Sequence, residues 1–472
     1  MTRAARILSF VVLPVLAALL AATVVFVSSR GPGPALLVWG PSVWPMDTPV
    51  PLRVAVVGPD DAVLQIRSLR ARAVGVQGYP LAIAREPRCD AAQVSVRFPH
   101  TPTDRILVEV RAITARGEVV ARARVRRGAT VRPDRPVPRE GVRGAMSGPV
   151  RVDAFPVGGA LATSDPLPVL LRFASQPSGA PWSGEASVEV RAGSLQSPAP
   201  ASVRVNAAGV AELHVVPLLG DLAVDVSAGG RPARLLLPVR PARPTIHMAA
   251  RAAPGTAFEV RSASGAKCAY VDYFVDDGPA PGVGIRRHAD SAPLQKGRAA
   301  FTIPRHLGGV VAIQASTHFG DPGEAVTVRH LWVGDADDDA RALARLGVAL
   351  GASIADAPLL LRAGLAALDR VRYPPALLAD GGADEAARLA AVRHDVRSRG
   401  VAGIGLCALA EAILLGRAGA RARRRAREIE SDAARATDTP PPPARSDMIE
   451  IIAFVAAAIA GFAALAAVAG MV

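Results

Sequence analysis

Aliphatic residues alternate with polar ones through most of the middle of this 472-residue chain. In residues 52–56 and 106–110 every second position is aliphatic, and glycine- or proline-containing turns separate such runs. A period of two is typical of a β-strand that buries one face. The pattern predicts a mainly β fold with tandem β-sandwich domains, at residues 35–130, 148–240 and 245–333.

Long apolar segments flank this β-rich region. Residues 7–27 are uncharged, and a helix of that length is about 31 Å long, enough to cross a bilayer core of about 30 Å. Residues 400–416 and 448–472 are also strongly apolar. We therefore predict an N-terminal transmembrane anchor, followed by the β domains and then by two C-terminal transmembrane helices. A signal peptide cleaved near Val27 and Ser28 is the alternative for the first segment.

A helical pattern connects the β domains to the second apolar segment. Aspartates between Asp335 and Asp339 mark its start, because a helix N-terminus favours negative charge. The sequence predicts a helical juxtamembrane stalk at residues 335–399. A calcium-binding EF-hand loop is not predicted there, because its sixth and twelfth positions are Ala340 and Leu346 instead of glycine and glutamate.

The arginine- and proline-rich stretch 417–447 sets the expected orientation. Short arginine-rich loops stay on the cytoplasmic side of a membrane, and Arg3 and Arg6, before the first apolar segment, indicate the same side for the N-terminus. We predict that this stretch is a cytoplasmic loop of a bacterial inner-membrane protein and that residues 28–399 are periplasmic. The candidate interaction residues of the loop are Arg417, Arg421, Arg423, Arg424, Arg425 and Arg427.

Two features of the apolar segments are candidates for specific contacts. Glu411 is the only charged residue of 400–416, and a carboxylate inside a membrane is usually paired or functional. We interpret it either as partly exposed near the cytoplasmic surface or as the partner of an arginine in its own chain or in another subunit. Ala453, Ala457 and Gly461 form a small-residue stripe that lets another helix approach closely, although alanine is abundant throughout this chain.

The net charge is +14, and arginine supplies nearly all of the positive charge, since only Lys267 and Lys296 are lysines. We interpret this bias, together with the abundant alanine, as the product of a GC-rich coding sequence. Aromatic residues make up 4% of the chain and do not interrupt the arginine run, whereas a nucleic-acid groove needs them for stacking. We therefore predict the lipid bilayer and envelope proteins as partners, and no nucleic acid.

The sequence predicts no catalytic, cofactor or metal site. Nucleophile-elbow, P-loop, Rossmann and HExxH motifs are all absent from it. No two of the eight histidines have helical ligand spacing, although a folded sheet could bring four of them together: His288, His306, His318 and His330.

The cysteines are Cys89, Cys268 and Cys407, and they form no CxxC pair. Cys407 lies in an apolar segment and is interpreted as a small packing residue. We interpret Cys89 and Cys268 as free thiols in different domains. A disulfide between them stays open as an alternative, because an oxidising compartment would allow it.

One hairpin carries a resemblance to a known family. Residues 203–217, VRVNAAGVAELHVVP, are similar to the strand–turn–strand signature of bacterial immunoglobulin-like and macroglobulin-type β-sandwich modules. The resemblance implies an immunoglobulin-like fold and a structural or adhesive role. The thioester motif Cys-Gly-Glu-Gln of active macroglobulins is absent, because Asp90 follows Cys89 and Ala269 follows Cys268. The resemblance therefore does not imply protease trapping.

These observations lead to more than one functional hypothesis. The first is a membrane-anchored bacterial envelope protein that presents periplasmic immunoglobulin-like modules for binding or scaffolding. The second is an accessory subunit of an inner-membrane transport, secretion or motility complex, acting through its C-terminal helices and arginine loop. The third is an enzyme of unrecognised type, which no motif supports. Partner identity, oligomeric state and biological process do not follow from the sequence.

Overall fold

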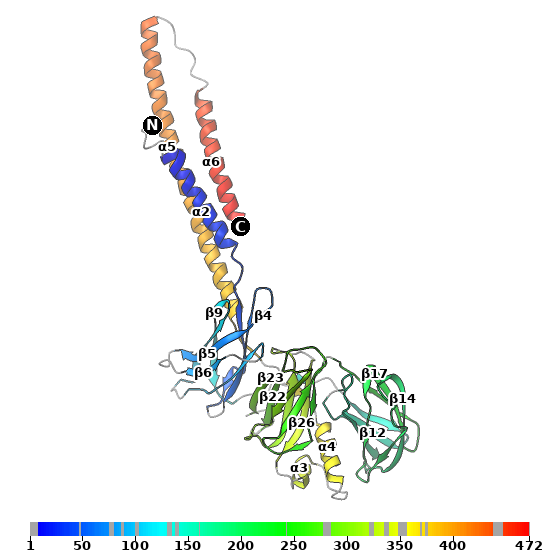
Figure 1. The fold of residues 1–472 in the computed structure, drawn as a ribbon. Coiled ribbons are helices and arrows are strands. Elements are labelled where there is room, and N and C mark those ends of the chain that lie inside the picture. The colour runs from blue at the N-terminus through cyan, green and yellow to red at the C-terminus, as the bar shows by residue number, and fades with distance from the viewer. Residues whose placement is uncertain are drawn as a thin grey trace. The chain divides into compact units, whose positions relative to one another are not determined.

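The computed structural model describes residues 8–46, 49–74, 80–85, 89–99, 103–129, 135–136, 141–159, 161–241, 243–276, 285–320, 325–334, 339–347, 356–368, 371–372, 376–437 and 447–471. The chain forms two compact units (Figure 1). The helical unit combines Met1–Gly33 with Gly382–Val472, and the β unit is Pro34–Gly381. The predicted mainly β fold, with tandem sandwiches and a helical C-terminal region, is confirmed.

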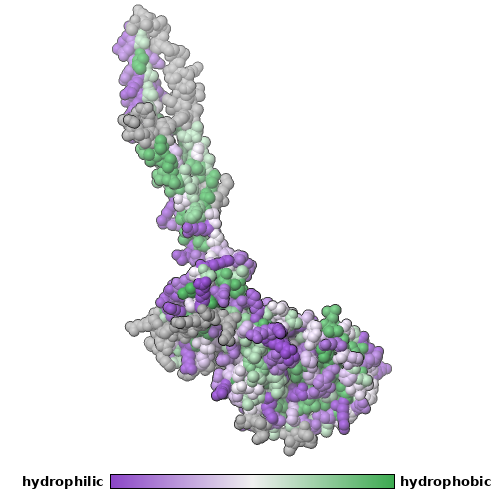
Figure 2. All heavy atoms as spheres, viewed as in Figure 1, coloured by the Kyte–Doolittle hydropathy of each residue, from purple (hydrophilic) through white to green (hydrophobic). Residues whose placement is uncertain are grey.

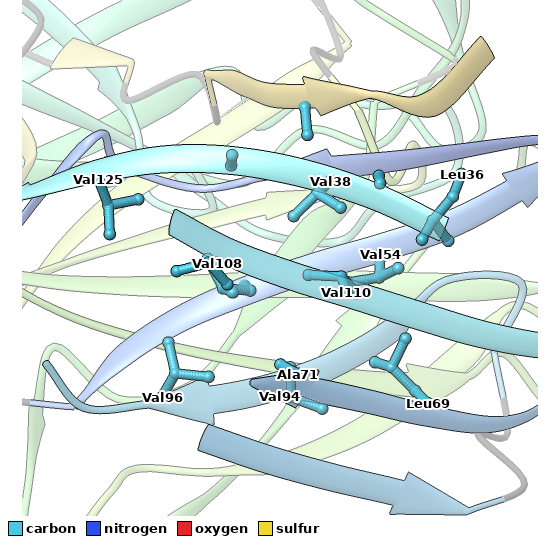
Figure 3. Close-up of a cluster of buried hydrophobic side chains, with 14 of the residues drawn as sticks. Leu36, Val38, Val54, Leu69, Ala71, Val94, Val96, Val108, Val110 and Val125 are labelled. Carbon is cyan, nitrogen blue, oxygen red and sulfur yellow. The ribbon is translucent and has the colours of Figure 1, made fainter. Parts of the chain in front are cut away.

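Sandwich 1 packs two five-stranded sheets against each other. Its side chains alternate as predicted, so that Val54, Val108 and Val110 point between the sheets into a common core (Figure 3). One sheet has the order β28-β1-β3-β4, with β7 on β3, and the other has the order β2-β9-β8-β5-β6. The strands are β1 (Ala35–Trp39), β2 (Val43–Trp44), β3 (Val50–Val57), β4 (Val63–Leu64), β5 (Ile66–Val74), β6 (Pro80–Arg85), β7 (Ala92–Val96), β8 (Arg105–Thr114), β9 (Gly117–Arg127) and β28 (Leu377–Asp380).

Sandwich 1 is discontinuous in sequence. Strand β28 follows the other two sandwiches in the chain, yet it pairs antiparallel with β1, and Ala379 joins the sandwich 1 core. A second short pair, β10 (Arg135–Pro136) with β27 (Val371–Arg372), also connects distant segments. The neighbouring residues 130–134 and 137–140 lie outside the described residues. The chain therefore leaves sandwich 1, builds two more sandwiches, and returns to complete it.

Sandwich 2 consists of two four-stranded antiparallel sheets, ordered β11-β12-β13-β16 and β15-β14-β17-β18. The hairpin that carries the family resemblance forms β15 and β16, and Gly209 in its turn has a φ of 74°. A side chain there would also meet the Phe173 carbonyl at 2.5 Å, so glycine is required. The strands are β11 (Val142–Ser147), β12 (Val150–Pro156), β13 (Val169–Ser175), β14 (Gly184–Leu195), β15 (Ser202–Val205), β16 (Val210–Leu213), β17 (Pro217–Ser227) and β18 (Ala233–Leu237).

Sandwich 3 pairs a three-stranded sheet, β19-β21-β24, with a five-stranded sheet, β20-β26-β25-β22-β23. Phe258, Tyr273 and Phe301 fill the space between the sheets as an aromatic cluster, with ring centroids 5.7–6.1 Å apart. The strands are β19 (Thr245–His247), β20 (Arg251–Ala252), β21 (Ala257–Arg261), β22 (Cys268–Asp276), β23 (Ile285–Pro293), β24 (Arg298–Thr302), β25 (Gly309–Ser316) and β26 (Val326–Val333).

The stalk predicted at 335–399 is not a single helical piece. Helix α3 (Asp339–Arg345) and helix α4 (Ala357–Ala367) pack on the β-sandwiches instead. Leu361 lies in a cluster with Trp332 of sandwich 3, and Ala363 lies in a cluster with Leu170 of sandwich 2. Both faces of α4 are apolar, so the helix is buried as a wedge between two sandwiches. Of the predicted N-terminal aspartates, Asp339 lies in the first turn of α3, and the others fall outside the described residues.

The helical unit contains three long apolar segments, as predicted. The first runs through the π-helix η1 (Leu8–Val12) into α2 (Leu13–Ser28), and the last is α6 (Asp447–Met471). The middle segment is part of α5 (Gly381–Thr437), a continuous helix of 57 residues. Ala17 of α2, Ile404 of α5 and Phe462 of α6 meet in one buried cluster, and Figure 1 shows the three helices side by side.

The arginine-rich stretch is helical up to Thr437, which corrects its interpretation as a loop. Alanine and arginine are both strong helix formers, so residues 417–437 extend the preceding turns without a break. The proline-rich part, residues 438–446, lies outside the described residues. Only α5 is both long and apolar enough to cross a membrane by itself, among the described helices; α2 and α6 contribute shorter apolar stretches.

Candidate functional site

Two kinds of contact hold the β unit together and position its surfaces. The first is a clamp between sandwich 1 and sandwich 3. Cys89, just before β7, forms a disulfide with Cys268, the first residue of β22, and their Cα atoms are 5.8 Å apart. The interpretation of both residues as free thiols is therefore wrong, and the bond joins two different sandwiches. Sequence spacing could not reveal the pair because 179 residues separate the two cysteines.

A buried ion cluster lies in the same clamp. Arg53 of β3 donates from Nη2 to both carboxylate oxygens of Asp272 at 3.2 Å, and Arg287 donates to Asp272 Oδ1 at 2.8 Å. Burial raises the pKa of Asp272, but the two arginines outweigh it and hold that pKa below its ordinary value. The Arg53 guanidinium also stacks on the Tyr270 ring, 4.8 Å from its centroid. Burial raises the pKa of Tyr270 to about 12, so its hydroxyl stays neutral.

The second contact leaves an open cleft of about 290 Å³ between sandwich 2 and sandwich 3. Its walls are the loop 162–166 of sandwich 2, the connecting residues Pro241, Arg243 and Thr245, and two turns of sandwich 3. Four cationic side chains line it: Arg243, Arg261, Lys296 and Arg298. Because several charged side chains converge on it, this cleft is the candidate ligand site of the β unit.

Local backbone geometry fixes one wall of the cleft. The chain passes from β23 to β24, which belong to opposite sheets of sandwich 3, through a tight turn at Lys296 and Gly297, whose φ angles are 52° and 74°. Two successive positive φ angles are typical of a type I′ turn, and two backbone hydrogen bonds between Gln295 and Arg298 close it. A side chain at Gly297 would meet the Ser262 carbonyl oxygen at 2.6 Å, so the neighbouring turn packs directly on this glycine. Lys296, one of only two lysines in the chain, is thereby held at the cleft.

A hydroxyl, an imidazole and a carboxylate meet beside the cleft, but they do not form a proton relay. His247 Nε2 lies 3.1 Å from Thr245 Oγ1 and 3.2 Å from Asp165 Oδ1. A nucleophilic triad needs the hydroxyl and the carboxylate on opposite ring nitrogens. Here both contact the same nitrogen, so Asp165 cannot orient the ring for proton transfer from Thr245. The trio is better suited to binding than to catalysis.

The cleft is electropositive overall. Glu259 accepts from Arg261 at 2.6 Å and lies 3.8 Å from Arg298, and Asp165 contributes a second carboxylate. Among the described residues around the cleft, four cations against two carboxylates leave an excess of positive charge. Arg298 keeps 62% of its side chain exposed, so it remains accessible to a ligand. The cleft therefore suits a small group with negative charge.

The histidines converge only in part. His288 and His306 have ring centroids 5.6 Å apart, and burial, with His306 nearby, lowers the pKa of His288. The ring contact between them is the part of the expected convergence that the described residues show. Within the described part of the chain, no group of three histidine, cysteine or acidic side chains has a metal-binding arrangement.

The site residues predicted in the helices lie apart from this cleft, in the other unit. Glu411 is 4% exposed and shares a helix face with Ile404 and Cys407, so the expected partial exposure of its side chain is not found. Its pairing with an arginine stays a prediction. The arginine cluster is on the helical extension of α5, where Arg423 is half-buried and the others are exposed: Arg417, Arg421, Arg424, Arg425 and Arg427.

The small-residue stripe of α6 faces away from the other helices. Ala457 and Gly461 are exposed, and a side chain built on Gly461 would meet nothing within 4 Å; the side chain of Ala453 lies outside the described set. The close approach between helices uses other glycines. A side chain at Gly400 of α5 would lie 2.3 Å from Val24 of α2, and one at Gly403 would lie 2.9 Å from Leu20.

Comparisons with known proteins add little to this geometry. The chain matches no protein-family model, and no curated protein sequence is detectably similar to it. Solved structures similar to it include the bacterial integrin-binding protein invasin, with 10% identity and a TM-score of 0.17 over 64% of this chain and 60% of that chain. Escherichia coli alpha-2-macroglobulin activated by porcine elastase has 10% identity and a TM-score of 0.15 over 65% of this chain and 35% of that chain.

The D1–D4 ectodomain fragment of ICAM-5 has 16% identity and a TM-score of 0.14, covering 63% of this chain and 76% of that chain. The chain thus spans 60% and 35% of the lengths of invasin and alpha-2-macroglobulin. The weak resemblance to immunoglobulin-like and macroglobulin-type modules is present, and it is limited to β-sandwich architecture. At these TM-scores the comparisons carry no argument about function.

Proposed function

We propose that this chain is a bacterial envelope protein, held in the inner membrane by α2, α5 and α6, that presents three β-sandwiches in the periplasm for binding or scaffolding. The observation that carries the proposal is that large apolar side chains are exposed on the outer surface of all three helices. Leu19 of α2 is 60% exposed, Leu406 of α5 is 66% exposed, and Ile452 of α6 is 58% exposed. Water would disfavour such a surface, whereas lipid tails would solvate it.

The hydropathy of the helical unit supports the same proposal. Figure 2 shows a hydrophobic band along the helices, with hydrophilic residues on α5 beyond each end of it. One of these hydrophilic groups is the arginine cluster that starts at Arg417. The positive-inside rule then assigns that end to the cytoplasm, and the β unit to the opposite side.

The disulfide between Cys89 and Cys268 supports a periplasmic location of the sandwiches by an independent route. Disulfides persist in oxidising compartments such as the bacterial periplasm and are rare in the reducing cytosol. Cys407, the remaining cysteine, is buried and unbonded in the helical unit. The disulfide joins sandwich 3 to sandwich 1, and α4 packs between sandwiches 2 and 3, so both contacts suit an arm that presents the cleft.

Labelling of single introduced cysteines in intact cells tests this orientation. We expect Ser178→Cys, in an exposed loop of sandwich 2, to react with a membrane-impermeant maleimide once the outer membrane is permeabilised. The matched variant Ser431→Cys, exposed on α5, should react only after the inner membrane is also lysed. Equal labelling at both positions before lysis, or recovery of the protein in a soluble fraction, would contradict the proposal.

A second candidate function is an accessory subunit of an inner-membrane complex. The exposed stripe at Ala457 and Gly461 favours it, because small residues on an unoccupied helix face allow another helix to pack closely. Substitution of both by isoleucine separates the two functions. If the isoleucine variant no longer co-purifies with a membrane protein, the subunit function is favoured. If a co-purifying protein is lost instead when the charges of Lys296 and Arg298 are reversed, the display arm is favoured.

A further inference from the structure

The outer face of sandwich 1 carries a regular array of arginines. On β5, β8 and β9 the inward positions are aliphatic and belong to the core, and the outward positions between them are largely arginine. We call this surface the arginine face, and it consists of Arg70, Arg72, Arg105, Arg111, Arg122, Arg124 and Arg126. The alternation predicted from the sequence therefore has a second consequence beyond burial, because it gathers charge on one side.

Strand register places some of these arginines directly opposite each other. Arg70 is the cross-strand partner of Arg111, and Arg105 is the partner of Arg126. Side chains at such positions have Cβ atoms about 5 Å apart, and like charges there destabilise a sheet. A fold gains nothing from this arrangement by itself, which points to an external anion that offsets the repulsion.

Two glutamates neutralise only part of the face. Glu109 accepts from Arg72, Arg111 and Arg122, and Glu118 contacts Arg111 at 3.1 Å. Seven arginines and two glutamates leave a net charge of +5. Considering the residues that the structure describes, no carboxylate pairs with the remaining four, all of which are exposed: Arg70, Arg105, Arg124 and Arg126.

The non-polar side chains of the face favour a lipid surface over a nucleic acid. The strands β5, β8 and β9 contain no aromatic residue on which a base could stack. Between the arginines are aliphatic side chains, among them Val74 and Ile113, which are 38% and 43% exposed. Basic and aliphatic side chains together match the boundary between lipid headgroups and acyl chains.

Chain connectivity keeps sandwich 1 close to any membrane that holds the apolar helices. Only residues 29–34 separate the end of α2 from the first strand of sandwich 1, and six residues reach about 20 Å when extended. At the other end, α5 begins directly after β28. Such a short tether raises the effective concentration of lipid headgroups at the sandwich, so that even weak attraction is sufficient.

We propose that the arginine face docks on the anionic phospholipid headgroups of the periplasmic leaflet. The proposal rests on the membrane anchorage proposed above. Each arginine close to an anionic surface shifts the docking equilibrium roughly fivefold, and the attraction falls off within about 10 Å at 0.1 M salt. Docking would therefore depend on anionic lipid and be reversed by salt, whereas anchorage by the helices would depend on neither.

Fluorescence quenching in nanodiscs tests the proposal with the full-length chain. A fluorophore is attached at Ile113→Cys in a Cys407→Ser background, and the discs contain nitroxide-labelled headgroups in phosphatidylcholine, with or without phosphatidylglycerol. We expect strong quenching only with phosphatidylglycerol, and its loss in about 1 M NaCl, where the screening length is about 3 Å. The triple variant Arg70→Glu, Arg124→Glu and Arg126→Glu should lower the docked-to-undocked ratio at least about tenfold.

A matched triple variant controls for net charge. Arg172→Glu, Arg204→Glu and Arg231→Glu make the same charge change at exposed sites of sandwich 2 and should leave quenching as in the unmodified chain. Equal quenching in both lipid compositions, or equal loss in both triple variants, would overturn docking. Binding of dissolved polyphosphate without quenching in anionic discs would overturn it in favour of a soluble polyanion. A chain that fails to enter discs would instead refute the proposed anchorage.

Discussion

Sandwich 1 and sandwich 2 each have a buried carboxylate surrounded by arginines on an outer sheet face, but the net charge of the two faces differs. In sandwich 1, Glu109 is the buried carboxylate among Arg72, Arg111 and Arg122. In sandwich 2, Asp225 is the buried carboxylate between Arg191 and Arg234. Each carboxylate lies on a strand with a hydrogen-bonded neighbour on both sides, so arginines from the flanking strands reach it.

The two faces differ in their net charge after the arginines and carboxylates of each face are counted. Along β14, β15, β17 and β18 the outer face of sandwich 2 has three arginines and four carboxylates: Arg191, Arg204, Arg234, Glu185, Glu189, Asp221 and Asp225. Its net charge is −1, against +5 on the arginine face of sandwich 1. The central carboxylate explains how each sheet accommodates its neighbouring arginines. The excess positive charge on sandwich 1 is not explained in this way and therefore calls for a functional explanation.

Removing the central carboxylate should sharpen this comparison most strongly. Glu109→Gln removes the acceptor for three arginines and leaves a face with more unbalanced positive charge. We therefore expect the free energy of unfolding of sandwich 1 to fall by about 2 kcal/mol. The figure is below that for a fully buried ion pair because the arginines are 38–61% exposed. Asp225→Asn should cost about 1 kcal/mol, because it has two arginine partners and a nearly neutral face.

Hydrogen exchange of the full-length chain in detergent measures both effects locally. Amides of β8 should lose protection in Glu109→Gln, and amides of β17 should lose it in Asp225→Asn, each without effect on the other sandwich. Glu185→Gln, an exposed carboxylate on sandwich 2, is a control that should change neither. An equal cost for the two central carboxylates would mean that the surplus charge on sandwich 1 has no energetic consequence.

Acid should weaken both sandwiches through the same groups. Burial raises the pKa of Glu109, but hydrogen bonds from its three arginines lower it from 4.5 to about 2. Hydrogen bonding by Arg234, then by Arg191, against burial, lowers the pKa of Asp225 from 3.8 to about 2. Because both values are depressed in the folded state, their stabilising contribution is complete above the ordinary pKa and is lost as the pH falls toward 2.

Tryptophan fluorescence separates the two responses. Trp44 is fully buried in sandwich 1, and Trp182 packs on Phe173 of sandwich 2, so variants that keep only one of the chain's four tryptophans, either Trp44 or Trp182, report each domain. We expect the Trp44 signal to start changing at a higher pH than the Trp182 signal, since Glu109 begins from a higher ordinary pKa. Glu109→Gln should flatten the Trp44 response alone. A Trp44 response unaltered by that substitution would show that other groups control acid unfolding.

The sequence predicted the architecture well because its evidence is local. Alternation in β8 and β14 reflects burial of one face of each strand, and the apolar composition of 7–27 and 448–472 belongs to the residues of each helix themselves. The errors came from long-range contacts and from composition. Nothing near Cys89 indicates Cys268, and nothing in Leu377–Asp380 indicates a strand that completes a sheet begun more than 300 residues earlier. Such pairings depend on how domains pack.

The candidate sites were harder to predict for the same reason. The cleft brings together residues from a loop of sandwich 2 and two turns of sandwich 3, and no spacing in the sequence links Asp165 with Lys296. The arginine face did leave a readable signal. Residues 121–126 read ARARVR, in which alternating arginines must share one side of a strand. Interpreting the arginines as a coding bias concealed that pattern, because bias explains residue identity but not position.

Salt provides the smallest expected effect and the most direct test of the difference between the two faces. Repulsion among exposed arginines weakens as the screening length falls from about 10 Å at 0.1 M salt to about 3 Å at 1 M. In detergent without anionic lipid, added NaCl should therefore stabilise sandwich 1 by less than about 1 kcal/mol and leave sandwich 2 nearly unchanged. The Trp44 and Trp182 variants report both midpoints in urea. The triple variant Arg70→Glu, Arg124→Glu and Arg126→Glu is the control, because it should abolish the effect of NaCl on sandwich 1. If NaCl acted by strengthening hydrophobic burial in general, its effect would persist in that variant and would appear in both sandwiches.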